Sequence, residues 1–251
     1  MGKIIAVVNQ KGGVGKTTTA VNLTAALTEA GKKVLLCDFD PQANATSGMG
    51  INKRKINKSI YDVVVNDTPV DAAIQTTKFG DVLPSSADLA GAAVELISME
   101  DANYRLKNAL YAVKDRYDAI LIDCPPSLEM LTINGLAAAD GILVPVQCEY
   151  FALEGLADLM TTLRLMKKRI NPNLEIFGVA LTMFDGRTNF STQVAQEVRH
   201  HFPGKVFATV IPRNVRLAEA PSHGLPVTAY DRHSRGAQAY KAMTEELIKR
   251  L

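Results

Sequence analysis

A glycine-rich loop near the N-terminus constrains the fold of this chain more than any other feature. The loop, KGGVGKTT at residues 11–18, follows an apolar, β-branched run at Ile4–Val8. A helical pattern at Lys16–Ala30 begins within the loop and ends before Gly31, a residue type that commonly ends helices. This order of strand, tight glycine turn and helix predicts a phosphate-binding loop, in which backbone N–H groups surround the phosphate oxygens.

The residue types of the loop suit this role. Glycine leaves the backbone N–H groups uncovered, because it has no side chain to block a phosphate. Lys16 is placed to reach the β- and γ-phosphates, and the Thr17 hydroxyl is placed to ligate Mg²⁺. The usual pattern has a glycine five residues before Gly15, where this chain has Gln10. The predicted nucleotide-binding residues of the loop are Lys11, Gly12, Gly13, Val14, Gly15, Lys16, Thr17 and Thr18.

Short apolar runs alternate with helical patterns along the chain. The runs are continuous and rich in β-branched residues, which is typical of parallel strands covered on both faces. The expected strands are Ile4–Val8, Val34–Cys37, Ala119–Ile122, Ile142–Val146, Ile176–Met183 and Phe207–Ile211. The expected helices are Lys16–Ala30, Tyr104–Tyr117, Leu153–Arg169, Thr192–Phe202 and Ala237–Leu251. This order predicts an α/β fold with a doubly wound, mostly parallel sheet flanked by helices.

We expect a single domain over residues 1–251. Residues 48–96 are less regular, with short helical pieces around Ile60–Val65 and Val70–Gln75, and we interpret them as an insertion within the domain. Hydrophobic residues make up 47% and charged residues 22% of the chain, which excludes disordered and fibrous architectures. No apolar run approaches about 18 residues, the length that crosses a membrane. The sequence therefore predicts a soluble, cytosolic protein.

Three cysteines, Cys37, Cys124 and Cys148, are widely spaced and form no CxxC pair. This spacing argues against a disulfide scaffold and against a clustered metal site.

Three aspartates follow expected strands. Asp38 and Asp40 end the run that begins at Val34, and Asp123 ends the run AILI. Carboxyl ends of parallel strands form the ligand-binding edge of an open sheet, so these side chains are expected beside the phosphate loop. Asp123 is the expected Mg²⁺ ligand, acting through water. Asp38 is a candidate for the outer coordination sphere of the Mg²⁺. The alternative for Asp38 and Asp40 is a cap on a strand end.

Lys11 is a second lysine in the loop, and KGGVGKTT resembles the deviant Walker A motif of the ParA/MinD group of P-loop ATPases. Residues 146–155 and 211–224 closely resemble the ParA/Soj proteins of this group, and the match extends over essentially the whole chain. The resemblance implies a P-loop NTPase fold and a Mg²⁺-dependent ATPase that converts ATP and water to ADP and phosphate. It also implies a function in chromosome or plasmid partition.

The resemblance further implies roles for individual residues. Each Lys11 would reach the nucleotide of the other subunit in an ATP-sandwich homodimer, so that Lys11, Lys16 and Asp40 form the catalytic set. Asp40 would orient the attacking water, which is consistent with the need of phosphoryl transfer for a positioned nucleophile. Pro212 and Asn214 would border the adenine.

The charge is unevenly distributed. Residues 164–251 carry 14 Lys and Arg against 7 Asp and Glu, whereas residues 1–163 carry 14 against 19. A basic C-terminal third favours an anionic partner. The resemblance implies that the ATP-bound dimer binds double-stranded DNA non-specifically through Arg187 and Arg216. A DNA-bound ParB-type partner would stimulate hydrolysis, which would release the DNA, and the protein would be cytoplasmic and nucleoid-associated. The alternative for Arg216 is an ion pair with Glu219.

Three other functions remain open. A MinD-like ATPase that cycles on membranes would use the last helix, Gln238–Leu251, but its few basic residues and lack of Trp and Phe favour packing on the sheet. We therefore expect no stable membrane association. An electron-transfer protein like nitrogenase iron protein would need two spaced cysteines for a shared cluster. A metabolic enzyme like dethiobiotin synthetase would leave Lys11 and the two arginines without a role.

Overall fold

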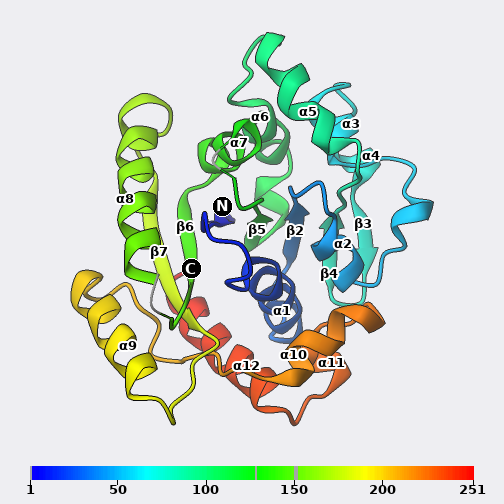
Figure 1. Cartoon of the computed structure of the whole chain (residues 1–251). Helices are drawn as coiled ribbons and strands as arrows, with labels where there is room; N and C mark the ends of the chain where they lie inside the picture. Colours follow the sequence, from blue (N-terminus) through cyan, green and yellow to red (C-terminus); the bar gives the residue numbers. More distant parts are fainter. Residues whose placement is uncertain (1, 128, 150–151) are drawn as a thin grey trace.

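The computed structural model describes residues 2–127, 129–149 and 152–251 (Figure 1). These segments form a seven-stranded sheet in the order β3-β4-β2-β5-β1-β6-β7, and all neighbouring strands are parallel except β3 and β4. The strands are β1 Lys3–Val7, β2 Val34–Asp38, β3 Gln75–Thr77, β4 Gly80–Leu83, β5 Ala119–Asp123, β6 Gly141–Gln147 and β7 Glu175–Thr182. The expected doubly wound, mostly parallel α/β fold is confirmed.

Helices cover both faces of the sheet (Figure 1). Successive side chains of a strand point to opposite faces, and accordingly Ile4 and Ala6 belong to one hydrophobic core while Ile5 and Val7 belong to the other. The core containing Ile4 is covered by α3 Ile60–Val64, α4 Val70–Ala73, α5 Leu89–Glu95, α6 Arg105–Tyr111, α7 Met130–Ala138, α8 Ala152–Arg169 and α9 Asn189–His201. The core containing Ile5 is covered by α1 Lys16–Glu29, α2 Asn44–Gly48, α10 Val215–Glu219, α11 Val227–Tyr230 and α12 Arg235–Ile248.

The region interpreted as an insertion contributes to the central sheet. β4 pairs in parallel with β2, with Val82 beside Leu36, and β3 returns antiparallel to β4. The two short helices expected there are present as α3 and α4. The sequence analysis did not predict β3, β4 or α7. The expected helix Tyr104–Tyr117 is shorter than predicted, because α6 ends at Tyr111 and a separate 3₁₀ turn follows at Lys114–Arg116.

The expected strand Phe207–Ile211 is wrong. This segment runs beside β7, where the Phe207 N–H donates to the Val179 carbonyl at 3.0 Å and the Ile211 N–H donates to the Leu181 carbonyl at 2.8 Å. Between these two bonds the N–H groups of residues 208 and 209 donate to the carboxylate of Glu246 in α12. The side chain of Glu246 thus replaces a strand partner, and only Phe207 and Ile211, at the two ends of the run, are buried.

The C-terminal helix α12 packs on the sheet, as predicted, on the same face as α1. Tyr240, Met243 and Leu247 are buried in the core that also contains α1, and the hydroxyls of Tyr240 and Thr19 lie 3.1 Å apart. The apolar face of this helix is therefore occupied by the protein core. Among the described residues, none of the helices combines the length and apolar character needed to cross a bilayer.

Cys37, Cys124 and Cys148 are buried free thiols. Burial raises the pKa of all three, and that of Cys148 rises to about 11.

Candidate nucleotide-binding site

The glycine-rich loop joins β1 to α1 at the carboxyl edge of the sheet, as predicted. Gly13 and Gly15 have φ angles of 74° and 92°, a region that other L-residues avoid. A Cβ atom placed on Gly12 or Gly13 would meet no atom within 4 Å, so these glycines border open space. α1 begins at Lys16 without a side-chain cap, which leaves the N–H groups of its first turn available to an anion.

Distant residues hold the loop in place. The Asn9 side chain donates to the Pro145 carbonyl of β6 at 2.7 Å and accepts from the Lys11 N–H at 3.0 Å. The Thr182 hydroxyl at the end of β7 donates to the Val14 carbonyl at 2.8 Å. The sequence analysis missed Asn9 and Thr182, although each is a polar residue at the carboxyl end of an apolar strand. The same rule that selected Asp123 could have found both.

Lys16 lies across the loop. Its ammonium donates to the Lys11 carbonyl at 3.0 Å, and burial lowers its pKa, partly offset by the negative charges of Asp123 and Asp40. Within the described part of the chain, the Lys16 ammonium forms no ion pair with a carboxylate. A bound phosphate group would supply that negative charge. Lys11 is half-buried in the same loop.

Asp38 and Asp123 lie side by side, because β2 and β5 pair in register at their last residues. The Asp38 carboxylate accepts from the Thr46 N–H and hydroxyl, both at 2.7 Å, and from the Asp40 N–H at 3.3 Å. Burial raises the pKa of Asp38 to about 6, against the lowering effect of these hydrogen bonds. Asp38 therefore holds the start of α2 and the backbone that carries Asp40.

Asp123 is fully buried, and neither of its carboxylate oxygens accepts a hydrogen bond of normal geometry from the described residues. Burial and the neighbouring Asp38 raise its pKa well above the usual range, while the nearby Thr17 hydroxyl and Lys16 ammonium lower it. A buried, unpartnered carboxylate is costly unless a cation balances it. Because carboxylate and hydroxyl oxygens are preferred Mg²⁺ ligands, Asp123 and Thr17 fit a magnesium site.

This arrangement predicts that Asp123→Asn stabilises the nucleotide-free protein. Removing the unbalanced charge should raise the free energy of unfolding by about 1–3 kcal/mol, and the melting midpoint by about 2–4 °C per kcal/mol in a chain of this length. Thermal unfolding without nucleotide measures the effect, and the same variant should lose the added stabilisation by ATP and Mg²⁺. A variant less stable than the native chain at pH 8 would contradict the prediction.

The same groups predict how stability depends on pH. Asp38 and Asp123 hold protons more tightly in the folded than in the unfolded chain, so the folded state binds more protons between their unfolded and folded pKa values. The free energy of unfolding should therefore fall as pH rises from about 4 to about 6 for Asp38, and further for Asp123. Urea unfolding at pH 5 and pH 8 measures this, and Asp123→Asn should reduce the difference.

A cavity of about 200 Å³ adjoins the loop. Gly15 and Thr18 of the loop region, Pro212 and Asn214, and Tyr240 of α12 are among the residues that line it. The structure thus brings the residues expected at the adenine to the same cavity as the phosphate loop. Tyr240 was not predicted as a site residue.

Asp40 follows β2 and is half-buried near the same edge of the sheet. Its carboxylate accepts from the Gln42 N–H at 2.9 Å, and its negative charge contributes to the raised pKa of Asp123. The three aspartates, Lys16 and Thr17 are therefore neighbours, as the sequence predicted for residues at the carboxyl ends of adjacent strands.

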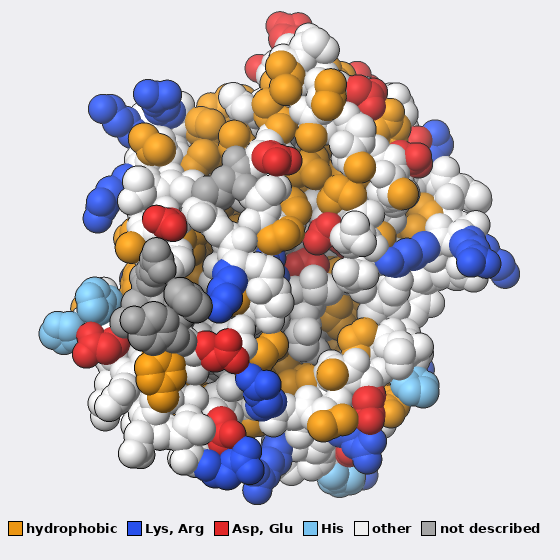
Figure 2. All heavy atoms as spheres, in the orientation of Figure 1, with side chains coloured by type: hydrophobic (Ala, Val, Ile, Leu, Met, Phe, Trp, Pro, Cys, Tyr) orange, Lys and Arg blue, Asp and Glu red, His pale blue; other side chains and the backbone are white. Residues whose placement is uncertain are grey.

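The two arginines expected to contact DNA lie outside this cluster. Arg187 is 89% exposed and donates to both carboxylate oxygens of Asp185, which lowers the pKa of Asp185 to about 2. Arg216 pairs with Glu219 at 2.7 Å and with Asp231 at 3.3 Å, so the ion pair considered as its alternative role is present. Figure 2 shows several Lys and Arg side chains along the lower edge of the molecule, where Figure 1 places α9–α12.

Comparison with known proteins identifies relatives over nearly the whole chain. A family model described as an AAA domain matches residues 2–176. Sporulation initiation inhibitor protein Soj of Bacillus subtilis is 56% identical over 98% of both chains. Chromosome partitioning protein ParA of Myxococcus xanthus is 50% identical over 100% of this chain and 89% of its own. A solved structure of cobyrinic acid a,c-diamide synthase from Mycobacterium smegmatis, with bound ADP and magnesium, is 37% identical with a TM-score of 0.86, covering 99% of this chain and 95% of that one.

The sequence identity, the fold and the position of the phosphate loop agree with one another. The resemblance that the loop and its second lysine indicated is confirmed by these full-length matches. This chain belongs to the ParA/Soj family of chromosome-partitioning ATPases.

Proposed function

We propose that this protein binds ATP and Mg²⁺ at the glycine-rich loop and hydrolyses ATP to ADP and phosphate. The observation that carries the proposal is the buried carboxylate of Asp123, which accepts no hydrogen bond of normal geometry from the described residues and lies beside Thr17 and the Lys16 ammonium. Negative phosphates and a divalent cation would balance both charges at once. The Mycobacterium smegmatis structure, solved with ADP and magnesium, supports this choice of ligands.

Each part of the site has a distinct role in this proposal. The loop backbone and Lys16 bind the phosphates, and Pro212 with Asn214 borders the adenine. Thr17 would hold Mg²⁺ through its hydroxyl, and Asp123 would hold it through water. When bound, the metal neutralises charge on the phosphates during phosphoryl transfer. The Asp40 carboxylate orients the water that attacks the γ-phosphate.

We further propose that ATP closes a homodimer in which Lys11 reaches the nucleotide of the partner subunit. Lys16 would serve the phosphates of its own loop, and the family resemblance carried by the second lysine assigns Lys11 to the nucleotide of the other subunit. Two lysines that act on two different nucleotides would make dimerisation depend on ATP.

This dimer is tested with Lys11→Ala. The variant should bind ADP as the native chain does, because Lys16 and the loop backbone remain. It should stay monomeric with a non-hydrolysable ATP analogue, whereas the native chain dimerises, as measured by sedimentation velocity. Lys32→Ala, which removes a half-buried lysine beyond α1, is the control and should dimerise normally. A native chain that stays monomeric at saturating analogue would overturn the proposal.

The DNA-binding part of the proposal concerns Arg187, Arg216 and the basic C-terminal third. Guanidinium groups bind backbone phosphates without regard to sequence, and such binding weakens as salt rises. Dimerisation would place two copies of each arginine on one molecule, which strengthens a weak contact through effective concentration. A DNA-bound ParB-type partner would stimulate hydrolysis and so release the DNA. Such a protein would work on the nucleoid in the cytoplasm, without stable membrane association.

The ion pairs of Arg216 give a test in which affinity rises. Glu219→Gln removes one competitor for the guanidinium, and an exposed ion pair is worth about 0–1 kcal/mol, so DNA affinity should increase up to about fivefold. Arg216→Ala should weaken binding and lower its salt dependence. Fluorescence anisotropy with a labelled duplex at several salt concentrations measures both. Glu245→Gln, an equal charge change on α12, is the control, and an equal gain there would contradict a specific role of Arg216.

A further inference from the structure

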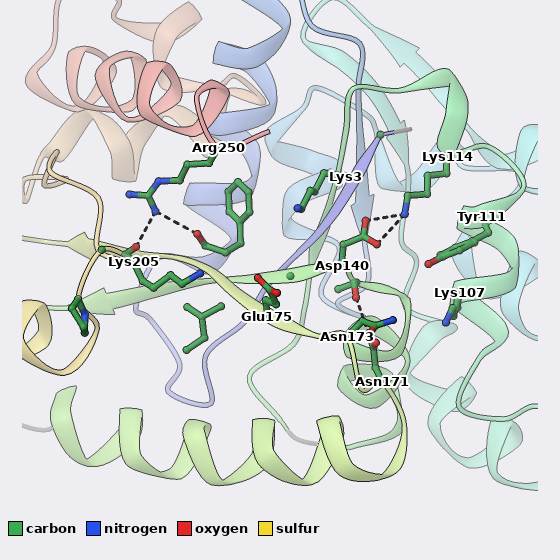
Figure 3. A pocket seen from close by; sticks show the side chains of 17 residues that line it. Lys3, Lys107, Tyr111, Lys114, Asp140, Asn171, Asn173, Glu175, Lys205 and Arg250 are labelled. Atoms are coloured by element: carbon green, nitrogen blue, oxygen red, sulfur yellow. Dashed lines mark hydrogen bonds and ion pairs between the residues drawn. The ribbon is translucent and has the colours of Figure 1, made fainter.

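A second cavity, which we call the basal cavity, lies at the edge of the sheet opposite the phosphate loop (Figure 3). Its volume is about 740 Å³, within the range of roughly 300–1,000 Å³ that is typical of small-molecule sites. Lys3, Gly141 and Glu175, the first residues of three parallel strands, line it. Because the phosphate loop leaves the other end of β1, the basal cavity is separate from the nucleotide site.

Cationic side chains outnumber carboxylates in the lining of the basal cavity, and one of the cations is neutralised by the protein itself. The Lys114 ammonium donates to both carboxylate oxygens of Asp140 at 2.9 Å, and Asp140 also accepts from the Ile4 N–H at 2.8 Å. The Lys114 side chain is only 9% exposed. This ion pair therefore belongs to the framework of the cavity and is not available to a ligand.

Arg250 supplies a fixed positive charge on the cavity wall. Its guanidinium donates to the backbone carbonyls of Phe177 at 3.3 Å, Lys205 at 2.9 Å and Val206 at 3.4 Å, and it lies 4.0 Å from the centre of the Phe207 ring. These neutral acceptors orient the guanidinium, and the Glu246 carboxylate lies near enough to interact electrostatically with it. The cation is thus held in position by the fold before any ligand arrives.

Three lysines add charge that the described residues do not neutralise. Lys3, Lys107 and Lys205 line the basal cavity, and no ion pair to a described acidic residue involves any of them. The Lys107 ammonium lies 5.4 Å from the centre of the Tyr111 ring. Among the residues that line the basal cavity, Glu175 is the one carboxylate besides Asp140, which is paired with Lys114. In Figure 3, Lys3 and Lys205 lie toward the Glu175 side of the cavity, and Lys107 lies on the far side.

We propose that the basal cavity binds a small anion carrying phosphate groups, with Lys3, Lys205 and Arg250 as its main contacts. Several like charges in one concave site raise the local concentration of an opposite charge. Ammonium and guanidinium groups match phosphate oxygens in both charge and hydrogen-bond donors. A concave site favours a small ligand over duplex DNA, whose phosphates lie on the outside of a convex rod.

The test measures binding of inorganic pyrophosphate to the full chain by isothermal titration calorimetry. A Lys16→Ala background removes the phosphate loop as a competing site. Pyrophosphate should bind this background saturably, and adding Lys3→Gln with Lys205→Gln should weaken binding at least tenfold. Glu175→Gln removes the remaining carboxylate and should tighten binding about threefold to fivefold, a gain that damage to the fold cannot imitate. Lys55→Gln with Lys78→Gln, both exposed elsewhere, should change binding less than twofold.

Each other outcome overturns the proposal. Absence of saturable pyrophosphate binding to the background would show that the basal cavity is not an anion site. An equal loss in the Lys55 and Lys78 variant would show that only net charge matters. If a short DNA duplex lost affinity with the Lys3 and Lys205 variant while pyrophosphate failed to bind, the lysines would serve DNA and not a small ligand. Because the background lacks Lys16, none of these results depends on the proposed ATPase function.

Discussion

Lys16→Ala should abolish nucleotide binding, with at least a hundredfold loss of affinity for ATP. The ammonium lies in the phosphate loop beside Asp123 and Asp40, so its removal leaves those negative charges facing the incoming phosphates. Charge-assisted hydrogen bonds are about twice as strong as neutral ones, and this contact is also partly buried. Titration with a fluorescent ATP analogue in the presence of Mg²⁺ measures the loss.

The fold of the Lys16→Ala chain should remain intact. Lys16 is buried at a cost, as its lowered pKa indicates, and its one protein hydrogen bond in the described residues is to the Lys11 carbonyl. Far-ultraviolet circular dichroism and the melting midpoint without nucleotide should therefore resemble those of the native chain. Lys32→Ala is the control and should bind ATP normally. Retention of native ATP affinity by Lys16→Ala would mean that the phosphates bind elsewhere.

Asp40→Ala should bind ATP and hydrolyse it about a hundredfold or more slowly, in the range that loss of a group positioning a reactant produces. The carboxylate follows β2 close to Asp123, but it is not part of the loop that binds the phosphates. Binding and turnover should therefore separate in this variant. The ATP-bound dimer would persist, and with it the proposed attachment to DNA.

Two measurements check the Asp40→Ala prediction. Phosphate release at saturating ATP should be nearly lost, and a DNA retardation experiment should show a persistent shifted complex with ATP and none with ADP. Asp115→Ala, at an exposed aspartate in the 3₁₀ turn after α6, should match the native chain in both. Normal hydrolysis by Asp40→Ala would exclude the role of this carboxylate in orienting water.

Local patterns in the sequence sufficed for the centre of the fold and for the position of the phosphate loop and the aspartates at one edge of the sheet. The phosphate loop and the strands that end at Asp38 and Asp123 are contiguous segments, so the residue types within each segment are enough to predict its local structure. Parallel pairing then brings both aspartates together without further information. Five of the six expected strands are present for this reason.

The features that escaped prediction depend on distant partners. Phe207–Ile211 has the composition of a strand, but two of its N–H groups donate to the carboxylate of Glu246, a residue of α12. β4 has four residues and is recognisable only through its pairing with β2. The bonds of Asn9 to Pro145 and of Thr182 to Val14 join residues more than 100 positions apart. A single sequence carries little signal for such contacts.

The bond between Thr182 and Val14 has a mechanical consequence. β7 ends at Thr182, and two residues later the Phe184 N–H donates to the Ile211 carbonyl while its own carbonyl accepts from the Arg213 N–H. The segment that leads to Arg216 is therefore hydrogen-bonded to Phe184, two residues beyond the end of β7, and the last residue of β7 contacts the glycine loop. We expect a displacement of that loop to be transmitted to the arginine-bearing surface through Thr182 and Phe184, across the one residue, Met183, that separates them.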